Sequence, residues 1–413
     1  MTAAVLDSSA YRLGAITAEQ TQRITAPSAM AVLLLPALCA LFLSKFAIPP
    51  YGAQGIGITV FVILLVVGAG FCLQCMRVDP VRAALFLVLT GALGIVPLLL
   101  GESFSLNSVF LFTAVHVPLI FSVAAGRDAA LKAAKIFLQL CFALAWLGIA
   151  QFFAQFVVDA SYVFPIENFV PPVFVVEFFN QQGPFGYGLD VFRSNGVFLL
   201  EPSYFAQLMA IAVVAELCIM DRVRRLPVYG LALLLAHSGT GIMILAVCLP
   251  LFVISRKRWD LLLIGALALI PLIVLREYLF LDRLMARAGE FGSIESSGFA
   301  RFVGGFYFFE EFLWNDPLRT LFGAGAGSFQ VYAPRSAYTA AEMPLFKALF
   351  EFGLLGTIAV FGFLAYCLFS RTISPLTSLA IAICFLLNGL YVPFAHAIAL
   401  SLVVWPQESG DSP

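Results

Sequence analysis

The sequence predicts an all-α fold, a polytopic helical membrane protein, and two observations lead to this fold class. Of the 413 residues, 62% are hydrophobic and only 11% are charged, whereas about 25% of the residues in a soluble globular chain are charged. The charged residues also occur in clusters. Apolar runs of roughly 20 residues separate these clusters, which is the length that an α-helix needs to cross a bilayer. The formal net charge of −1 comes with no basic tract, so no nucleic-acid partner is expected.

Eleven apolar stretches are expected to cross the membrane, or twelve if the last one is divided. The seventh and eighth are short and broken at His237–Gly241, and the last is long for one helix and contains Pro393. The expected spans are 28–46, 56–76, 82–100, 106–126, 130–157, 202–220, 226–237, 240–255, 260–276, 342–369 and 374–404. They divide the chain into an N-terminal segment (1–27), N-terminal spans (28–157), a first long loop (158–201), central spans (202–276), a second long loop (277–341) and C-terminal spans with a short tail (342–413).

The basic residues of the short loops predict the orientation of the chain. Alternate loops and the ends of the spans beside them contain 14 lysines and arginines, whereas the only basic residue at the short loops between them is Lys45, at the end of the first span. The 14 residues are Arg12, Arg23, Arg77, Arg82, Arg127, Lys132, Lys135, Arg222, Arg224, Arg225, Arg256, Lys257, Arg258 and Arg371. Because cytoplasmic loops carry an excess of Lys and Arg, the N-terminus is expected on the cytoplasmic side.

The two long loops then fall on the outer side, although they contain several arginines. Long loops cross a membrane largely regardless of their charge, so these arginines do not contradict the orientation. They either bind an anionic substrate or are solvated and paired with neighbouring acidic residues. The arginines in or next to the two loops are Arg193, Arg276, Arg283, Arg287, Arg301, Arg319 and Arg335.

The first candidate site is the stretch from Arg193 to Tyr204, which leads from the first long loop into the sixth span. Pro202 suits the first turn of a helix. Glu201 is therefore expected at the N-terminal end of this span, where the helix dipole favours an anion. The carboxylate of Glu201 either accepts a proton or holds Arg193 in a local ion pair.

The second candidate is His237-Ser-Gly-Thr-Gly241, a polar break inside an apolar hairpin. Irregular backbone at membrane depth is tolerated only where protein or a water-filled cavity surrounds it. Ser238 or Thr240 is expected to cap the eighth span and to leave backbone N–H groups for an anion. The alternative is a tight turn with an ordinary helix cap.

Two further candidates lie in or after the second long loop. Arg301 is the first, followed by the run Gly323-Ala-Gly-Ala-Gly327. This run lacks a P-loop lysine and follows no expected strand, so we expect it to pass close to other backbone rather than bind a nucleotide. Lys347 and Glu351 are four residues apart and share a helix face. Lys347 either belongs to a site or extends to the membrane surface.

No metal ion or other cofactor is expected. The sequence contains no HExxH motif, no second CxxC beside that of Cys72 and Cys75, and no histidine–carboxylate cluster in the outer loops. A serine-type triad is unsupported as well, because only His237 falls on the outer face.

Taken in order, the motifs resemble those of the Wzy-type O-antigen and exopolysaccharide polymerases and the related O-antigen ligases. The motifs are Arg193-Ser-Asn-Gly-Val-Phe, Glu201-Pro-Ser-Tyr, Ser238-Gly-Thr-Gly, Leu321-Phe-Gly-Ala-Gly-Ala-Gly-Ser-Phe and Glu351-Phe-Gly-Leu-Leu-Gly. Each motif is short, and the resemblance rests on their order and spacing over residues 193–356. The N-terminal spans share only the topology.

The resemblance implies a membrane glycosyltransferase of the GT-C type that works at the periplasmic face of the bacterial inner membrane. Its donor is a glycan on undecaprenyl pyrophosphate, its acceptor is another lipid-linked repeat unit, and a chain-length regulator is a further partner that the family allows. Arg193 and Arg301 would bind the pyrophosphate, since guanidinium groups suit its oxygens without a metal. Glu201 or His237 would act as the base or orient the acceptor, with inversion expected for a single displacement. Further candidates for substrate binding are Tyr204, Ser238, Thr240, Arg283, Arg287 and Lys347.

One departure from the family favours a polymerase over a ligase. The ligase branch usually carries a histidine shortly before the Glu-x-Gly-Leu-Leu-Gly helix, where this chain reads Ala340-Ala-Glu-Met-Pro344. A ligase would move the finished glycan to lipid A core or another acceptor. A third alternative is a transporter that moves the lipid-linked oligosaccharide without chemistry. It predicts inverted repeats and paired broken helices, and the sequence has one broken hairpin.

Overall fold

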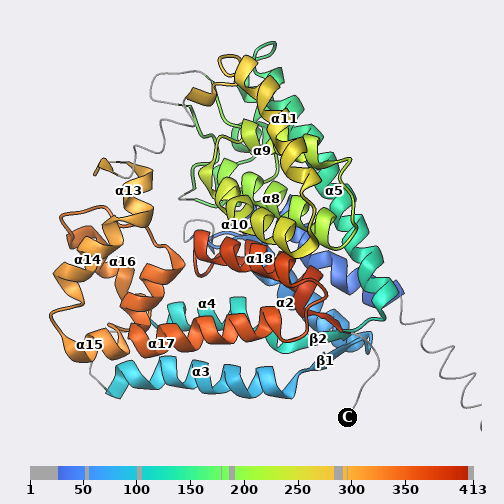
Figure 1. Ribbon diagram of the computed structural model, residues 1–413. Coiled ribbons are helices and arrows are strands. Elements are labelled where there is room, and N and C mark those ends of the chain that lie inside the picture. The colour runs from blue at the N-terminus through green and yellow to red at the C-terminus, as the bar shows by residue number, and fades with distance from the viewer. Residues whose placement is uncertain are drawn as a thin grey trace, which may run out of the picture.

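The computed structural model describes residues 27–51, 55–99, 105–177, 179–185, 191–282, 292–294 and 296–407. Most of these residues are helical, and the helices pack into one body (Figure 1). Residues 1–26 of the predicted N-terminal segment lie outside the described residues, as do the candidates Arg283 and Arg287.

The apolar helices follow the predicted spans. They are Pro27–Phe42, α2 (Ile58–Cys72), α3 (Pro80–Leu99), α4 (Leu106–His116), α5 (Arg127–Ala154), α8 (Pro202–Cys218), α9 (Leu226–Leu235), α10 (Gly239–Arg256), α11 (Asp260–Val274), α17 (Pro344–Phe369), α18 (Pro375–Leu387) and α19 (Pro393–Ala399). Four of the described helices are long and apolar enough to cross a membrane, namely Pro80–Pro97 within α3, and α5, α10 and α17. The fold therefore has the character of a helical membrane protein.

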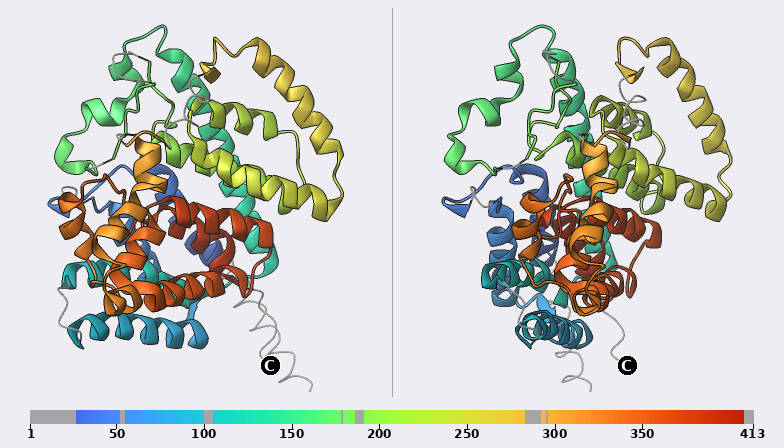
Figure 2. Two further views of the ribbon diagram at one scale, coloured as in Figure 1. Left: turned by 60° about the vertical axis from the view of Figure 1, so that its left-hand side comes forward. Right: turned by 90° about the vertical axis from the view of Figure 1, so that its left-hand side faces the viewer.

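Helix α11 illustrates this character on the surface. It lies at the outer edge of the molecule (Figure 2), and its apolar side chains face outward. Leu263, Ile270 and Ile273 are 65%, 59% and 66% exposed. Several exposed large apolar side chains on one helix are unusual on a soluble monomer and mark contact with a membrane or a partner.

Helix α8 lies at the centre of the helices. Its residues from Pro202 to Leu217 are all buried, and it packs against α5, α9, α10 and α18. A helix that is apolar all round is stable only when other elements surround it. The closest packing is with α10, because a Cβ atom on Gly241 would lie 2.5 Å from the carbonyl oxygen of Ala206.

The last predicted span is divided, as its length and Pro393 allowed, and the fourth predicted span ends as a helix earlier than expected. The last span, 374–404, is divided at Asn388–Val392 into α18 and α19, and a π-helix (Leu400–Val404) continues α19. The fourth predicted span, 106–126, ends as helix after the 3-10 turn Val117–Ile120. Its last residues form a strand instead.

The all-α prediction missed a small sheet. Strands β1 (Met76–Val78) and β2 (Phe121–Ala124) are antiparallel, with Arg77 opposite Ser122. Strand β3 (Pro406–Gln407) pairs in parallel with β2. The sheet joins three turns at one end of the helices. We call this end of the molecule the sheet end. The sheet ties the C-terminal segment to the N-terminal half of the chain.

Both predicted long loops contain short helices. The first loop includes α6 (Ala160–Val163), α7 (Pro165–Phe169) and η3 (Pro172–Phe174), and the second includes α13 (Ser297–Phe302), α14 (Gly304–Phe312), α15 (Pro317–Phe322), α16 (Ser328–Tyr332) and η5 (Ala333–Arg335). Helices α13 to α16 gather around the N-terminal part of α17 (Figure 1). We call the side formed by these two segments the loop end.

The glycine run passes close to other backbone, as predicted. It crosses α17 where Gly353 interrupts the helix with a φ of +64°. The N–H groups of Ala324 and Gly325 donate to the carbonyl oxygens of Phe350 and Glu351 at 2.9 and 3.0 Å. A Cβ atom on Gly323 would lie 2.3 Å from the carbonyl oxygen of Glu351, so only glycine allows this approach.

Candidate functional site

The structure brings Glu201 and Arg301 together, although 100 residues separate them in the sequence. The Arg301 Nη2 atom lies 3.7 Å from Glu201 Oε2. The side chain of Glu201 is 11% exposed and that of Arg301 is 34% exposed. The pair is therefore open to a ligand on the arginine side, while the carboxylate is held within the protein.

Glu201 stands at the N-terminal end of α8, as the position of Pro202 predicted. Its Oε1 atom accepts a hydrogen bond from the backbone N–H of Asn180 at 2.8 Å. Its Oε2 atom accepts one from the Ser203 hydroxyl at 2.9 Å. Both carboxylate oxygens thus have donors, in addition to the Arg301 guanidinium and the favourable end of the helix dipole.

Arg301 is positioned by the short helix α13. Ser296 begins this helix by accepting a hydrogen bond from the N–H of Phe299. The N–H of Ala341 donates to the Ala300 carbonyl at 2.8 Å. A Cβ atom on Gly304 would lie 2.1 Å from the carbonyl oxygen of Thr339. The segment before α17 therefore fixes the backbone that carries Arg301.

Tyr204 lies one turn into α8 and is buried. Its ring makes edge contacts with Phe394 of α19 at a centroid distance of 5.0 Å and with Phe179 of the first loop at 6.3 Å. Tyr204 therefore lines the inner side of the site and connects α8 with both the first loop and the C-terminal helices.

Arg193 is held by the same loop that contacts Glu201. Its backbone N–H and its Nε atom both donate to the carbonyl oxygen of Gly183, at 2.8 and 3.2 Å. A Cβ atom on Gly183 would lie 2.5 Å from the guanidinium, so the side chain packs directly on this glycine. The segment 180–183 thus contacts both Arg193 and Glu201.

The polar break at His237 is real, but its side chains do not cap α10 as predicted. Ser238 occupies the N-cap position without a side-chain capping bond. Its hydroxyl pairs with that of Thr240 at 3.0 Å, and Thr240 Oγ1 donates to the Ser203 carbonyl at 3.3 Å. His237 is buried, with a φ of +42°, against the rings of Phe185 and Phe152. The break therefore contacts the first turn of α8 through the hydrogen bond of Thr240 to Ser203.

Lys347 belongs to a buried polar cluster and does not extend to the surface. It pairs with Glu351 at 3.6 Å, as their spacing predicted, and with Glu342. The Tyr391 hydroxyl donates to Glu351 Oε2 at 2.9 Å, and the Lys347 ammonium lies 4.8 Å from the centre of the Tyr391 ring. Sequence reasoning missed Tyr391. Its place in the polar break between α18 and α19 was the available signal.

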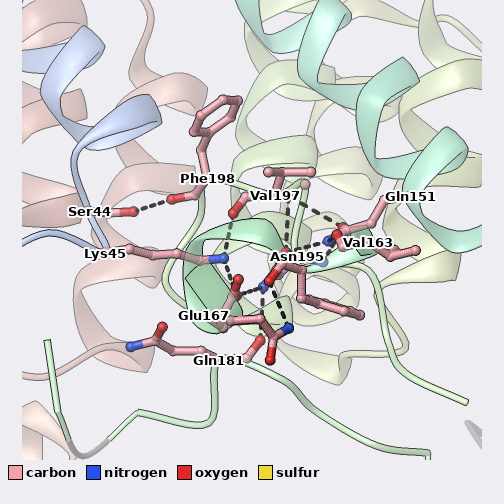
Figure 3. A network of polar contacts seen from close by, with 12 residues as sticks. Ser44, Lys45, Gln151, Val163, Glu167, Gln181, Asn195, Val197 and Phe198 are labelled. Atoms are coloured by element: carbon pink, nitrogen blue, oxygen red, sulfur yellow. Dashed lines mark hydrogen bonds and ion pairs between the residues drawn. The ribbon is translucent and has the colours of Figure 1, made fainter. Parts of the chain in front are cut away.

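A second buried network was not predicted at all (Figure 3). Lys45, from the loop after the first helix, donates to Glu167 Oε1 and to the carbonyl oxygen of Val197. The Asn195 side chain donates to Glu167 Oε1 and to the Gln181 carbonyl at 2.9 and 2.8 Å. Burial lowers the pKa of the Lys45 ammonium to about 8, and the Glu167 carboxylate opposes this shift.

This network holds a strained turn directly before Glu201. Gly196 and Val197 have φ values of +64° and +68°. A β-branched residue in this region costs about 1–3 kcal/mol and persists only where its surroundings enforce it. The N–H of Val197 donates to Asn195 Oδ1 at 3.0 Å, and Gln151 in turn donates to the same oxygen at 2.9 Å. The approach to α8 is therefore fixed from both sides.

The fold and the site together define an apolar helical protein that presents a partly exposed arginine–carboxylate pair at its loop end. In the described part of the chain, no three histidine, cysteine, aspartate or glutamate residues are grouped so that they could hold a metal ion. No protein-family model, curated protein or solved structure matches the chain.

Proposed function

We propose that this chain is a membrane glycosyltransferase, a polysaccharide polymerase of the Wzy type. It transfers a glycan from undecaprenyl pyrophosphate to a sugar hydroxyl of another lipid-linked repeat unit, at the outer face of the bacterial inner membrane. The proposal includes a cytoplasmic sheet end and N-terminus, which place the loop end outside. The 14 basic residues of the alternate short loops support this orientation.

The Glu201–Arg301 pair is the observation that carries the proposal. The leaving group of the reaction is a lipid pyrophosphate, which a planar guanidinium group binds with two parallel hydrogen bonds. Arg301 is a third exposed and next to the N-terminal end of α8, where an anion is favoured. Arg193, held on Gly183 of the segment that also contacts Glu201, supplies a second guanidinium.

The reaction is a single displacement. The acceptor hydroxyl oxygen bonds to C1 of the donor sugar, and the bond from C1 to the pyrophosphate oxygen breaks, with inversion at C1. Overall, the hydroxyl proton ends on the released pyrophosphate. Glu201 orients Arg301 in this scheme, because donors already engage both of its oxygens. Arg301 stabilises the charge that develops on the leaving group.

Reconstitution tests this proposal. Purified protein in liposomes, given a lipid-pyrophosphate repeat unit alone, is expected to make a ladder of longer products and to release undecaprenyl pyrophosphate without added metal or nucleotide. Transfer of one glycan to added lipid A core without a ladder would instead identify a ligase. Movement of the lipid across the bilayer without any product would identify a transporter.

A further inference from the structure

An open cavity of about 350 Å³ lies in the first loop, beside α7 and residues 175–177 and 179–182. This volume falls in the range of about 300–1,000 Å³ that is typical of small-molecule sites. The cavity is lined by Glu167, Asn168, Val170, Pro172, Val175, Val176, Glu177, Phe179, Asn180, Gln181 and Gln182.

The chemistry of the lining is that of a sugar site. Two carboxylates and four carboxamides line the cavity, and no basic residue does. Carboxylate and amide groups can each engage two neighbouring hydroxyls, one amide both donating and accepting. The apolar lining, Phe179 and Pro172 among it, suits the C–H face of a sugar ring.

One side chain of the lining has an oxygen without a hydrogen-bond donor in the described part of the chain. Glu167 lines the cavity with a side chain only 7% exposed. Its Oε1 atom accepts from Lys45 and Asn195, whereas its buried Oε2 atom has no hydrogen-bond partner among the described residues. A buried acceptor without a donor is costly, and a hydroxyl group in the cavity would supply the donor once a small side-chain shift exposed Oε2.

The cavity also adjoins the Glu201–Arg301 pair. Asn180 lines the cavity, and its backbone N–H donates to Glu201. Phe179 lines it too and contacts the ring of Tyr204. The buried network of Lys45, Glu167 and Asn195 also binds the Gln181 backbone, so it ties α7 to the residues beside Asn180 (Figure 3).

We propose that this cavity is a subsite for an uncharged sugar residue, neutral or N-acetylated, of the glycan that the protein handles. The subsite rests on the proposed function for the origin of its glycan. Lys45 pairs with Glu167 from behind the lining, whereas the exposed Glu177 adds a carboxylate and no cation lines the cavity, so the acid group of a uronic acid meets like charge without a partner. The cavity therefore selects among glycans by charge, next to the groups that bind the pyrophosphate.

The test is direct binding to the full-length protein in lipid nanodiscs, measured by saturation-transfer NMR. The probes are two soluble oligosaccharides of equal length, one containing N-acetylhexosamine and neutral hexose, the other containing a uronic acid. We expect the first to bind and the second to bind at least tenfold more weakly. The double variant Asn180→Ala, Gln182→Ala should lose at least tenfold in affinity for the first probe. Asn315→Ala, which removes an exposed amide elsewhere, should bind like the wild type.

Three results would overturn the subsite: no binding of either probe, equal binding of the uronic acid probe, or unchanged affinity in the double variant. The variant Arg301→Lys separates this proposal from the function. This variant should lower chain growth at least about 100-fold and still bind the neutral probe. Equal ladders from the wild type and the double variant would contradict the proposed subsite and agree with the proposed polymerase function. Binding of the neutral oligosaccharide without any ladder from the wild type would contradict the polymerase function and agree with the subsite.

Discussion

The two ends of the molecule use charged side chains in different ways. At the sheet end, Arg82 is fully buried beside Asp79 and donates to the carbonyl oxygen of Val404 at 3.0 Å. Glu216 is buried in α8 and pairs with Arg225 at 3.0 Å. At the loop end, Arg301 meets Glu201 at 3.7 Å and stays a third exposed.

The difference separates structural ion pairs from one that can exchange its partner. If a buried arginine moves away from a helix end, the carbonyl oxygen and the carboxylate that it contacted stay buried without a partner. The longer and more exposed contact of Arg301 can rearrange around an anionic ligand at low cost, since such contacts are worth about 0–1 kcal/mol. The comparison therefore predicts losses of activity at the loop end and losses of stability at the sheet end.

The largest effect is expected for Arg301→Lys. Lysine keeps the charge but loses the planar fork that binds two phosphate oxygens. We expect chain growth to fall at least about 100-fold, as for the removal of one stabilising donor in an active site, at normal protein levels. Arg193→Lys should have a similar effect. The measurement is product ladders from reconstituted protein, with Arg335→Lys, an exposed arginine of the same loop, as the control. Near-normal growth in both variants would exclude these arginines from the site.

At the sheet end, Arg225→Met is expected to reduce stability without changing the chemistry. It leaves the Glu216 carboxylate buried with the Tyr229 hydroxyl at 3.5 Å. Breaking a buried pair costs about 3–5 kcal/mol. Because Arg225 is 24% exposed, we expect about 2 kcal/mol, seen as a lower unfolding temperature in detergent.

Arg224→Met is the matched control for Arg225→Met, since it removes an exposed charge from the same turn. Activity per folded molecule should be normal in both variants. A selective loss of activity in Arg225→Met at normal stability would contradict the structural role of the sheet end.

Much of this comparison could be predicted from the sequence, because apolar length and Pro202 place helix α8 and its Glu201 end correctly. The i, i+4 spacing also predicted the Lys347–Glu351 pair. The sheet was missed because Phe121–Ala124 is short and apolar and continues a span in composition. The Lys45–Glu167 and Tyr391–Glu351 contacts were missed because they join segments 122 and 40 residues apart, and no local pattern encodes such pairings.

Close packing between α8 and α10, outside both ends, gives a third prediction. In Gly241→Ala, the added methyl group would meet the Ala206 carbonyl at 2.5 Å, and backbone cannot move aside as a side chain can. Overpacking of this kind costs about 1–3 kcal/mol. The measurement is thermal unfolding in detergent. Gly239→Ala is the matched control, because a Cβ atom there meets nothing within 4 Å. Equal stability of the two variants would contradict the close contact of α8 and α10.

The smallest effect is expected for Glu201→Gln, which distinguishes a base from a residue that positions Arg301. Glutamine keeps a carbonyl oxygen to accept the Asn180 N–H but removes the charge next to Arg301. If Glu201 only orients Arg301, chain growth should fall about tenfold, equivalent to about 1.4 kcal/mol, and the pH dependence of the rate should keep its shape. A general base contributes about 10²–10⁴-fold, and its loss would also remove the acid limb of the pH profile. The latter result would assign proton transfer to Glu201. Glu201 and Arg301 would then both act on the reacting groups, and Glu201 would no longer be only the residue that orients Arg301.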